Sequence, residues 1–255
     1  MKLSPGRLRY GEEATLVEHL EELRGRLVIA LLALAVGFGV AYGFHAHLIH
    51  WLELALPPDR RHLLTLGVAE PFLTSVQVSL YAGFLIAMPV ILWQIWAFFS
   101  PALQDGSRRA ISGMVAFATF LGIGGLVFAY VVALPASLKF LTSYDDKLYN
   151  QQIQAKLYIS YASLVLLAVT VVFEVPIVIL GLVRIGVLSH AKLKRNRRLG
   201  YVIMTAVAVA LPGVDPVTTM IETVPLWILF EGSIWAALLL ERRTRSRPLA
   251  TADLD

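Results

Sequence analysis

The chain has 255 residues, of which 57% are hydrophobic and only 16% are charged, and its mean hydropathy is +0.69. These values indicate an integral membrane protein and exclude an ordinary water-soluble domain. The sequence has no cysteine, which excludes disulfides and thiolate chemistry. Its net charge of +4 comes from basic residues placed between apolar runs, so nucleic-acid binding is not expected.

The residues before the first apolar run predict a cytoplasmic amphipathic entry helix within residues 1–26. Its apolar stripe recurs at helical spacing and consists of Leu16, Val17, Leu20, Leu23 and Leu27. Thr15 and Glu18 have the spacing of a capping box and mark the start of the helix. Glu22 lies four residues before Arg26, which favours an intrahelical ion pair. That pair is one explanation of Glu22 that needs no ligand.

Six stretches with few or no charges predict six transmembrane helices, because a charge at the bilayer centre costs about 2.5 to 3.5 kcal/mol. In chain order they are 27–44, the stretch between Glu70 and Asp105, the one between Arg109 and Lys139, the one between Lys156 and Arg184, 199–214 and 216–240. The fifth has 16 residues, or about 24 Å of helix, against about 30 Å of hydrocarbon. We therefore expect a short final hairpin that thins the bilayer around it.

The placement of lysine and arginine predicts the orientation of this single domain, residues 1–255. Seventeen of the 22 basic residues lie in one set of loops that includes both ends of the chain. By the positive-inside rule both termini are cytoplasmic, and 241–255 is expected to be a disordered basic tail in a protein of the cytoplasmic membrane. The opposite loops, 45–70 and 135–156, contain polar and amphipathic stretches that predict a short interfacial helix and a cap over that face.

Enzymatic chemistry is not expected from this sequence. All six histidines lie outside the span interiors, so a Ser-His pair or a histidine metal site at membrane depth has no candidate. No HExxH, GxSxG or phosphate-binding loop occurs. The histidines of HAHLIH at 45–50 are more typical of an interfacial polar stretch than of a metal site. We therefore expect neither a metal nor a cofactor.

Two acids have positions that need an explanation. Glu174 is a lone charge near the middle of the fourth span, where it is costly unless it faces a cavity, a partner or water, or stays protonated. An interhelical hydrogen bond is the structural alternative. A proton-coupled secondary transporter of a small solute that uses Glu174 is a further alternative, although the internal repeats it predicts are not seen. Glu22 lies on the basic cytoplasmic face, where its carboxylate suits a guanidinium ligand.

Seven segments, in order along the chain, resemble the TatC family, the polytopic core subunit of the twin-arginine protein translocase. They are HLEELRGRL at 19–27, EPF at 70–72, MPVILWQIWAFFSPAL at 88–103, FAYVVALP at 128–135, FEVPIVIL at 173–180, LPGVDPVT at 211–218 and VPLWILFE at 224–231. The resemblance covers essentially the whole chain. It implies a receptor and scaffold that binds twin-arginine signal peptides of folded cargo and exports the cargo with the proton motive force. It also implies an oligomeric complex with the single-span subunits TatA, TatB or both.

The resemblance assigns the signal-peptide site residue by residue. The family's first acid falls on Glu22, and its second falls on the position before two basic residues, where this chain has Ser107. Asp105 is the substitute that we expect, and the alternative is that Asp105 only caps the third span. Arg24, in the same segment as Glu22, and Phe98, which matches a family aromatic position, complete the candidate set. Core packing is the alternative for Phe98.

The remaining assignments concern the spans. The resemblance implies that Glu174 faces a concave surface within the bilayer and is a polar docking point for the single-span subunits, with Tyr130 as an aromatic position inside the bundle. Asp215, in the turn before the last span, and Glu231, near the cytoplasmic end of that span, match family acids. Turn formation at GVDP and an interfacial helix end explain these two acids equally well.

Overall fold

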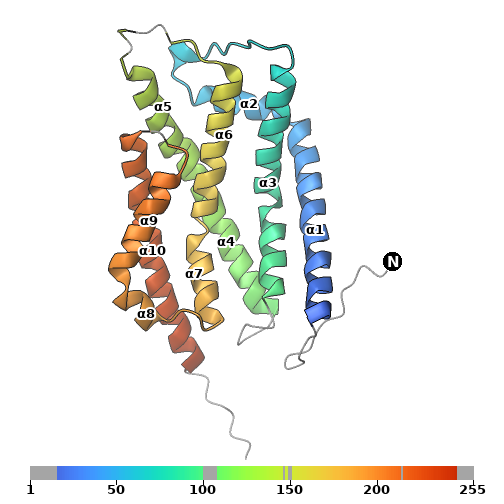
Figure 1. The fold of residues 1–255 in the computed structure, drawn as a ribbon, viewed down its shortest axis with the longest axis vertical. Helices are drawn as coiled ribbons and strands as arrows, with labels where there is room; N and C mark the ends of the chain where they lie inside the picture. Colours follow the sequence, from blue (N-terminus) through green and yellow to red (C-terminus); the bar gives the residue numbers. More distant parts are fainter. Residues whose placement is uncertain (1–15, 100–107, 146, 149–150, 214, 246–255) are drawn as a thin grey trace, which may run out of the picture.

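The computed structural model describes residues 16–99, 108–145, 147–148, 151–213 and 215–245, and it is a bundle of helices (Figure 1). The elements are α1 (Leu16–Gly43), α2 (His45–Leu54), η1 (Pro58–Arg60), α3 (Glu70–Phe98), α4 (Arg108–Phe128), η3 (Ala129–Ala133), α5 (Leu134–Ser143), α6 (Ala155–Val172), α7 (Val175–Arg184), α8 (His190–Arg195), α9 (Arg197–Ala210) and α10 (Pro216–Arg245). The all-helical class predicted from the sequence is confirmed.

Five stretches of the described helices are long and apolar enough to cross a membrane. They are His19–Gly43, Glu70–Phe98, Ile111–Ser143, Ala155–Arg184 and Pro216–Arg242. Helix α9 has 14 residues and lies where the sequence predicts the short fifth span. It is not among these five stretches, so the count of six spans stays a prediction. Helix α10 has 30 residues, so the final hairpin is short on the α9 side only. Because α10 continues to Arg245, the tail that we expected to be disordered from residue 241 begins as helix.

The third span is longer than the sequence indicates. We expected a loop from Pro135, but α4 continues through the π-helical turn η3 into α5, which ends at Ser143. Pro135 lies in the first turn of α5, and the wider π turn before it accommodates a ring that has no N–H to donate. The predicted loop is therefore wrong as far as Ser143.

The fourth span is interrupted at Glu174. Helix α6 ends at Val172 and α7 begins at Val175, with Pro176 in its first turn. A proline cannot donate to the preceding turn, so the helix breaks just before it. Glu174 occupies the N-cap position of α7, which places this acid in the break between the two halves of the span.

Both described ends of the chain lie at the same end of the bundle. In Figure 1 the start of α1, the short helix α8 and the end of α10 all lie at the lower end of the bundle, which we call the inner end. Helix α2 and the loop that follows it lie at the opposite end, the outer end. The turn between α9 and α10 stops short of the outer ends of α5 and α6 (Figure 1). This arrangement is the one expected of a chain with both termini on one side of a membrane.

Helix α1 is held to the bundle by close contact with α3. A Cβ atom added to Gly37 would lie 2.4 Å from the carbonyl oxygen of Gly83, and one added to Gly83 would lie 2.6 Å from the backbone nitrogen of Phe38. Small residues at a helix crossing let two backbones approach closely, which is the main source of packing energy between helices in lipid. These two glycines therefore fix the place where α1 crosses α3.

The outer loops are joined to each other through Glu70 at the start of α3. Its carboxylate accepts hydrogen bonds from the backbone N–H groups of Leu66 (2.9 Å), Gly67 (3.1 Å) and Lys156 (3.1 Å), and from the side chain of Gln154 (3.1 Å). One acid thus ties the segment before α3 to the segment before α6. A short helix, α2, is present where the sequence predicts an interfacial one. Its position at the membrane interface and a cap over the outer face stay predictions.

Candidate functional site

Glu22 lies in the second turn of the described part of α1, at the inner end. Its carboxylate accepts hydrogen bonds from Arg26 Nε (3.0 Å) and Arg26 Nη2, and both end on Oε1. The other oxygen, Oε2, faces the His19 ring at 3.9 Å. The predicted intrahelical pair is confirmed, and the Glu22 side chain is 14% exposed. The carboxylate thus binds a guanidinium through Oε1, while Oε2 faces His19.

An aromatic contact joins this turn of α1 to the end of α3. The rings of His19 and Phe98 are stacked with centroids 4.3 Å apart and planes at 22°, and Phe99 meets Phe98 edge to face at 5.5 Å. The structure therefore brings Phe98 next to Glu22, as the resemblance implies, through His19. Sequence reasoning missed His19, although its position three residues before Glu22 places the two on one helix face.

The remaining candidates of the signal-peptide site are Arg24, Asp105 and Ser107. The side chain of Arg24 is exposed, and because it is two residues from Glu22 it projects from a different face of α1. Asp105 and Ser107 lie outside the described residues, in the segment between α3 and α4. The question of which of these two positions supplies a second acid therefore stays a prediction.

Glu174 lies inside the bundle and is 5% exposed. It packs against α4, where a Cβ added to Gly122 would lie 2.9 Å from Glu174 Oε1 and 3.4 Å from the terminal methyl group of Met88. Neither carboxylate oxygen has a hydrogen-bond partner within the described residues, so the predicted interhelical hydrogen bond is not formed there. The side chain lies against the backbone of Gly122, and its orientation toward a concave surface within the bilayer stays a prediction.

Tyr130 is separate from Glu174. It lies in the π-helical turn, and its hydroxyl donates to the backbone oxygen of Trp51 on α2 at 2.8 Å. It also lines an apolar cavity of about 660 Å³ between α2, α3, η3 and α6, together with Leu48, Val78, Leu126 and Ser163. The two residues that the resemblance groups as intramembrane polar positions are therefore at different places in the bundle.

Asp215 is 2% exposed and caps the last helix. Its Oδ1 accepts from the backbone N–H of Thr218 (2.7 Å), the bond of an N-cap residue, and its Oδ2 accepts from Ser137 Oγ on α5 (3.0 Å). The predicted role in the turn is thus present, and a link to α5 comes in addition. Glu222, which follows on the same helix, is also 2% exposed. Sequence reasoning did not select Glu222 as a site, although a charge near the start of the sixth span was visible.

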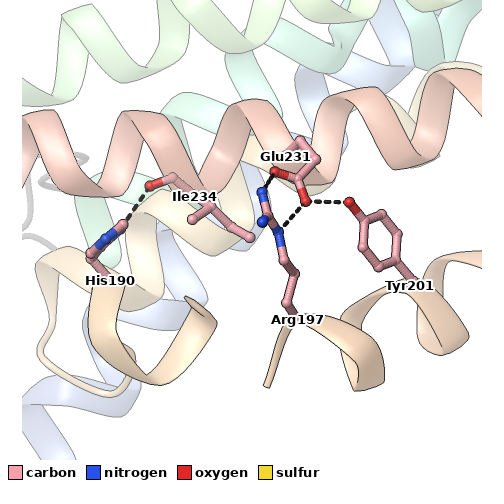
Figure 2. A network of polar contacts seen from close by, with 5 residues as sticks. All are labelled: His190, Arg197, Tyr201, Glu231 and Ile234. Atoms are coloured by element: carbon pink, nitrogen blue, oxygen red, sulfur yellow. Dashed lines mark hydrogen bonds and ion pairs between the residues drawn. The ribbon is translucent and has the colours of Figure 1, made fainter. Parts of the chain in front are cut away.

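Glu231 is the centre of a polar network between α9 and α10, shown in Figure 2. Arg197 donates to it through Nε (2.5 Å) and Nη2, and the Tyr201 hydroxyl donates to the same carboxylate. The hydrogen bond to Glu231 raises the pKa of Arg197, so the guanidinium stays charged. Nearby, His190 Nδ1 lies 3.1 Å from the backbone oxygen of Ile234 (Figure 2). Glu231 therefore forms an ion pair with Arg197 that connects α10 to the start of α9 at the inner end.

The fold and these sites define a multi-pass helical membrane protein with an acidic side chain presented at its inner end. The family model described as "Sec-independent protein translocase protein (TatC)" matches residues 18–225. The chain belongs to the TatC family of protein translocase subunits. Membership of this family assigns the chain to protein transport. The alternative of a small-solute transporter is therefore not retained.

Individual relatives agree with this assignment. The TatC protein of Aquifex aeolicus is 34% identical over 235 residues, which cover 90% of this chain and 97% of the relative. A chloroplastic relative from Arabidopsis thaliana is 33% identical over 234 residues, covering 91% of this chain and 68% of its own length. A solved structure titled "Crystal Structure of Twin Arginine Translocase Receptor- TatC in DDM" matches with a TM-score of 0.76 and 33% identity, covering 86% of this chain and 99% of that one.

Proposed function

We propose that this chain is the signal-peptide receptor and scaffold of a twin-arginine translocase. The observation that carries the proposal is the Glu22 carboxylate at the inner end of α1, which holds a guanidinium through one oxygen and lies beside the His19–Phe98 stack. The solved relative is titled a twin-arginine translocase receptor. The site and the name of that relative point to the same ligand, a peptide with two neighbouring arginines.

The geometry supports a specific mode of recognition. Arg26 donates through two nitrogens to one oxygen of Glu22, so a ligand arginine replaces Arg26 or shares the carboxylate with it. A guanidinium offers planar, paired donors that match a carboxylate, whereas a lysine ammonium does not. The stacked rings of His19 and Phe98 supply aromatic surface beside Glu22 against which a second guanidinium packs. In the proposal, Asp105 supplies the second acid in place of the glutamate missing at Ser107.

The scaffold role concerns the single-span partners TatA and TatB, at least one of which the proposal places against the bundle at the break between α6 and α7. Glu174 is the polar group that we assign to them. A buried carboxyl group without a donor within the described residues gains a hydrogen bond when a partner provides one, and this gain favours association. In the proposed arrangement both termini are cytoplasmic, the last two helices complete a six-span bundle, and transport uses the proton motive force without nucleotide hydrolysis.

The test is export in cells whose only copy of this subunit is the chain or a variant of it. Glu22→Lys replaces the acid by a charge that repels the arginine pair, and export of a reporter with a twin-arginine leader should be lost. Glu21→Lys is the matched control, because Glu21 is the exposed neighbour on the same turn. Export that continues in the Glu22→Lys cells at the level of the Glu21→Lys cells would overturn the proposal.

A further inference from the structure

A buried polar site lies where the α9–α10 turn meets α5 and α6, and we call it the outer acid site. It consists of Ser137, Tyr161, Asp215, Thr218 and Glu222. Ser137 Oγ lies 2.5 Å from the Tyr161 hydroxyl and donates to Asp215 (3.0 Å), which leaves the tyrosine as the donor to the serine. Asp215 also receives the backbone N–H of Thr218. Asp215 therefore accepts two hydrogen bonds, one of them from a serine that itself accepts from Tyr161.

Glu222 faces the same site and receives none of these hydrogen bonds. A Cβ atom added to Gly213, two residues before Asp215, would lie 3.9 Å from Glu222 Oε2, so the carboxyl group lies against the turn. It interacts electrostatically with Asp215 and with Tyr161. Neither oxygen of Glu222 has a partner within the described residues, and the same holds for the fully buried hydroxyl of Thr218 one helical turn earlier.

Among the residues that the structure describes, none supplies a compensating cation beside Glu222. From α6 the titratable neighbour is Tyr161, and from the turn it is Asp215. Lys139 on α5 is exposed, and the η3 tyrosine, Tyr130, donates to Trp51. The part of α9 that follows Tyr201 has no titratable side chain, and on α7 the basic residue Arg184 lies in the last turn. Two ionised carboxylates in one such site would repel each other without solvent or a counter-ion.

We infer that the outer acid site binds one proton, which Glu222 carries. Both acids are 2% exposed. Asp215 has donors that stabilise a carboxylate, whereas Glu222 has none within the described residues, and a buried acid without donors favours its neutral form. A protonated Glu222 is itself a donor, and both Asp215 and the Thr218 hydroxyl are acceptors within the site. The turn that carries Asp215 is recessed from the outer ends of α5 and α6 (Figure 1), so the proton is exchanged from the outer half of the bundle. This inference does not depend on signal-peptide binding.

The experiment is an infrared titration of the purified full chain in lipid nanodiscs. A buried protonated carboxyl group gives a carbonyl band that shifts in deuterium oxide. The titration is done in a Glu174→Gln background, because among the described residues Glu174 is the other buried acid whose carboxyl oxygens have no hydrogen-bond partner. We expect the band near neutral pH in Glu174→Gln and its loss in Glu174→Gln/Glu222→Gln. The absence of the band from Glu174→Gln, or its persistence in the double variant, would overturn the inference.

A third variant keeps the test independent of how well the double variant folds. Asp215→Asn removes the repelling charge, keeps one oxygen as acceptor for the Thr218 N–H, and places an NH2 group that donates to Ser137 Oγ. Glu222 should therefore lose its proton at a lower pH in Glu174→Gln/Asp215→Asn than in Glu174→Gln. An unchanged titration in Glu174→Gln/Asp215→Asn would show that the two acids do not share a site. Each titration is repeated with sodium replaced by N-methylglucamine. A sodium-dependent midpoint would contradict the assignment to a proton and indicate a cation site.

Discussion

The Glu22 carboxylate accepts the Arg26 guanidinium one helical turn away, and both hydrogen bonds end on the same oxygen. Arg26 therefore occupies the carboxylate that we propose as the binding group for an arginine of the signal peptide. An intrahelical pair of this kind is worth about 0.3 to 0.5 kcal/mol. Arg26 is therefore an internal competitor that a peptide displaces at low cost.

Removing this competitor should strengthen peptide binding. In Arg26→Gln the Glu22 carboxylate is free, and the affinity for a twin-arginine peptide should rise about twofold, the equivalent of the lost pair. Isothermal titration of the purified chain measures the change. Lys194→Gln removes a charge from the same end of the bundle, on the exposed side of α8, and serves as the control for net charge. Weaker binding in Arg26→Gln than in Lys194→Gln would mean that Arg26 helps to hold the ligand.

The α1–α3 crossing should not tolerate a larger side chain. Gly83→Leu places a Cβ atom 2.6 Å from the Phe38 backbone, and overpacking of this kind costs about 1 to 3 kcal/mol. We expect a lower melting temperature in detergent and weaker peptide binding, because His19 and Phe98 are carried by these two helices. Gly39→Leu is the matched control, since a Cβ at Gly39 has nothing within 4 Å. Equal melting temperatures for the two variants would contradict the close crossing.

The Glu231–Arg197 pair should stabilise the last hairpin in a salt-dependent way. Arg197→Lys keeps the charge but loses the paired donors that reach both oxygens of Glu231. We expect a modest loss of thermal stability for Arg197→Lys and a larger one for Arg197→Gln, with both differences reduced in high salt because the guanidinium is half exposed. A double-mutant cycle with Glu231→Gln isolates the pair. Additive effects in that cycle would show that Arg197 acts elsewhere.

Glu174 should matter for partner recruitment through its hydrogen-bonding capacity. Glu174→Ala removes the group that is unpartnered within the described residues, and co-purification of a single-span subunit should fall. Glu174→Gln keeps the size and an acceptor, so recruitment should stay closer to that of the unchanged chain. The comparison is quantified by mass spectrometry of the purified complex, with thermal unfolding to confirm that both variants are folded. Recruitment that is equal in the two folded variants would remove Glu174 from the proposed interface.

The sequence predicts the spans well because apolar runs are bounded by charges at the membrane interface. It also predicts the Glu22–Arg26 pair, since helical spacing alone brings two residues four apart together. It does not predict the π-helical turn at Ala129–Ala133, because proline normally indicates the end of a helix and the neighbouring helices decide whether the backbone continues. The sequence shows the charge of Glu222 but does not indicate a site there, for a related reason. Its burial against Asp215 depends on how α10 packs on α5, and no local pattern encodes that contact.

The most direct test of the central claim is the preference for arginine over lysine at Glu22. The affinities of an Arg-Arg peptide and a Lys-Lys peptide are measured for the unchanged chain, for Glu22→Gln and for Glu21→Gln. The account predicts a clear preference for the Arg-Arg peptide in the unchanged chain and in Glu21→Gln, and a ratio near one in Glu22→Gln. An unchanged preference in Glu22→Gln would contradict the claim that this carboxylate recognises the arginine pair.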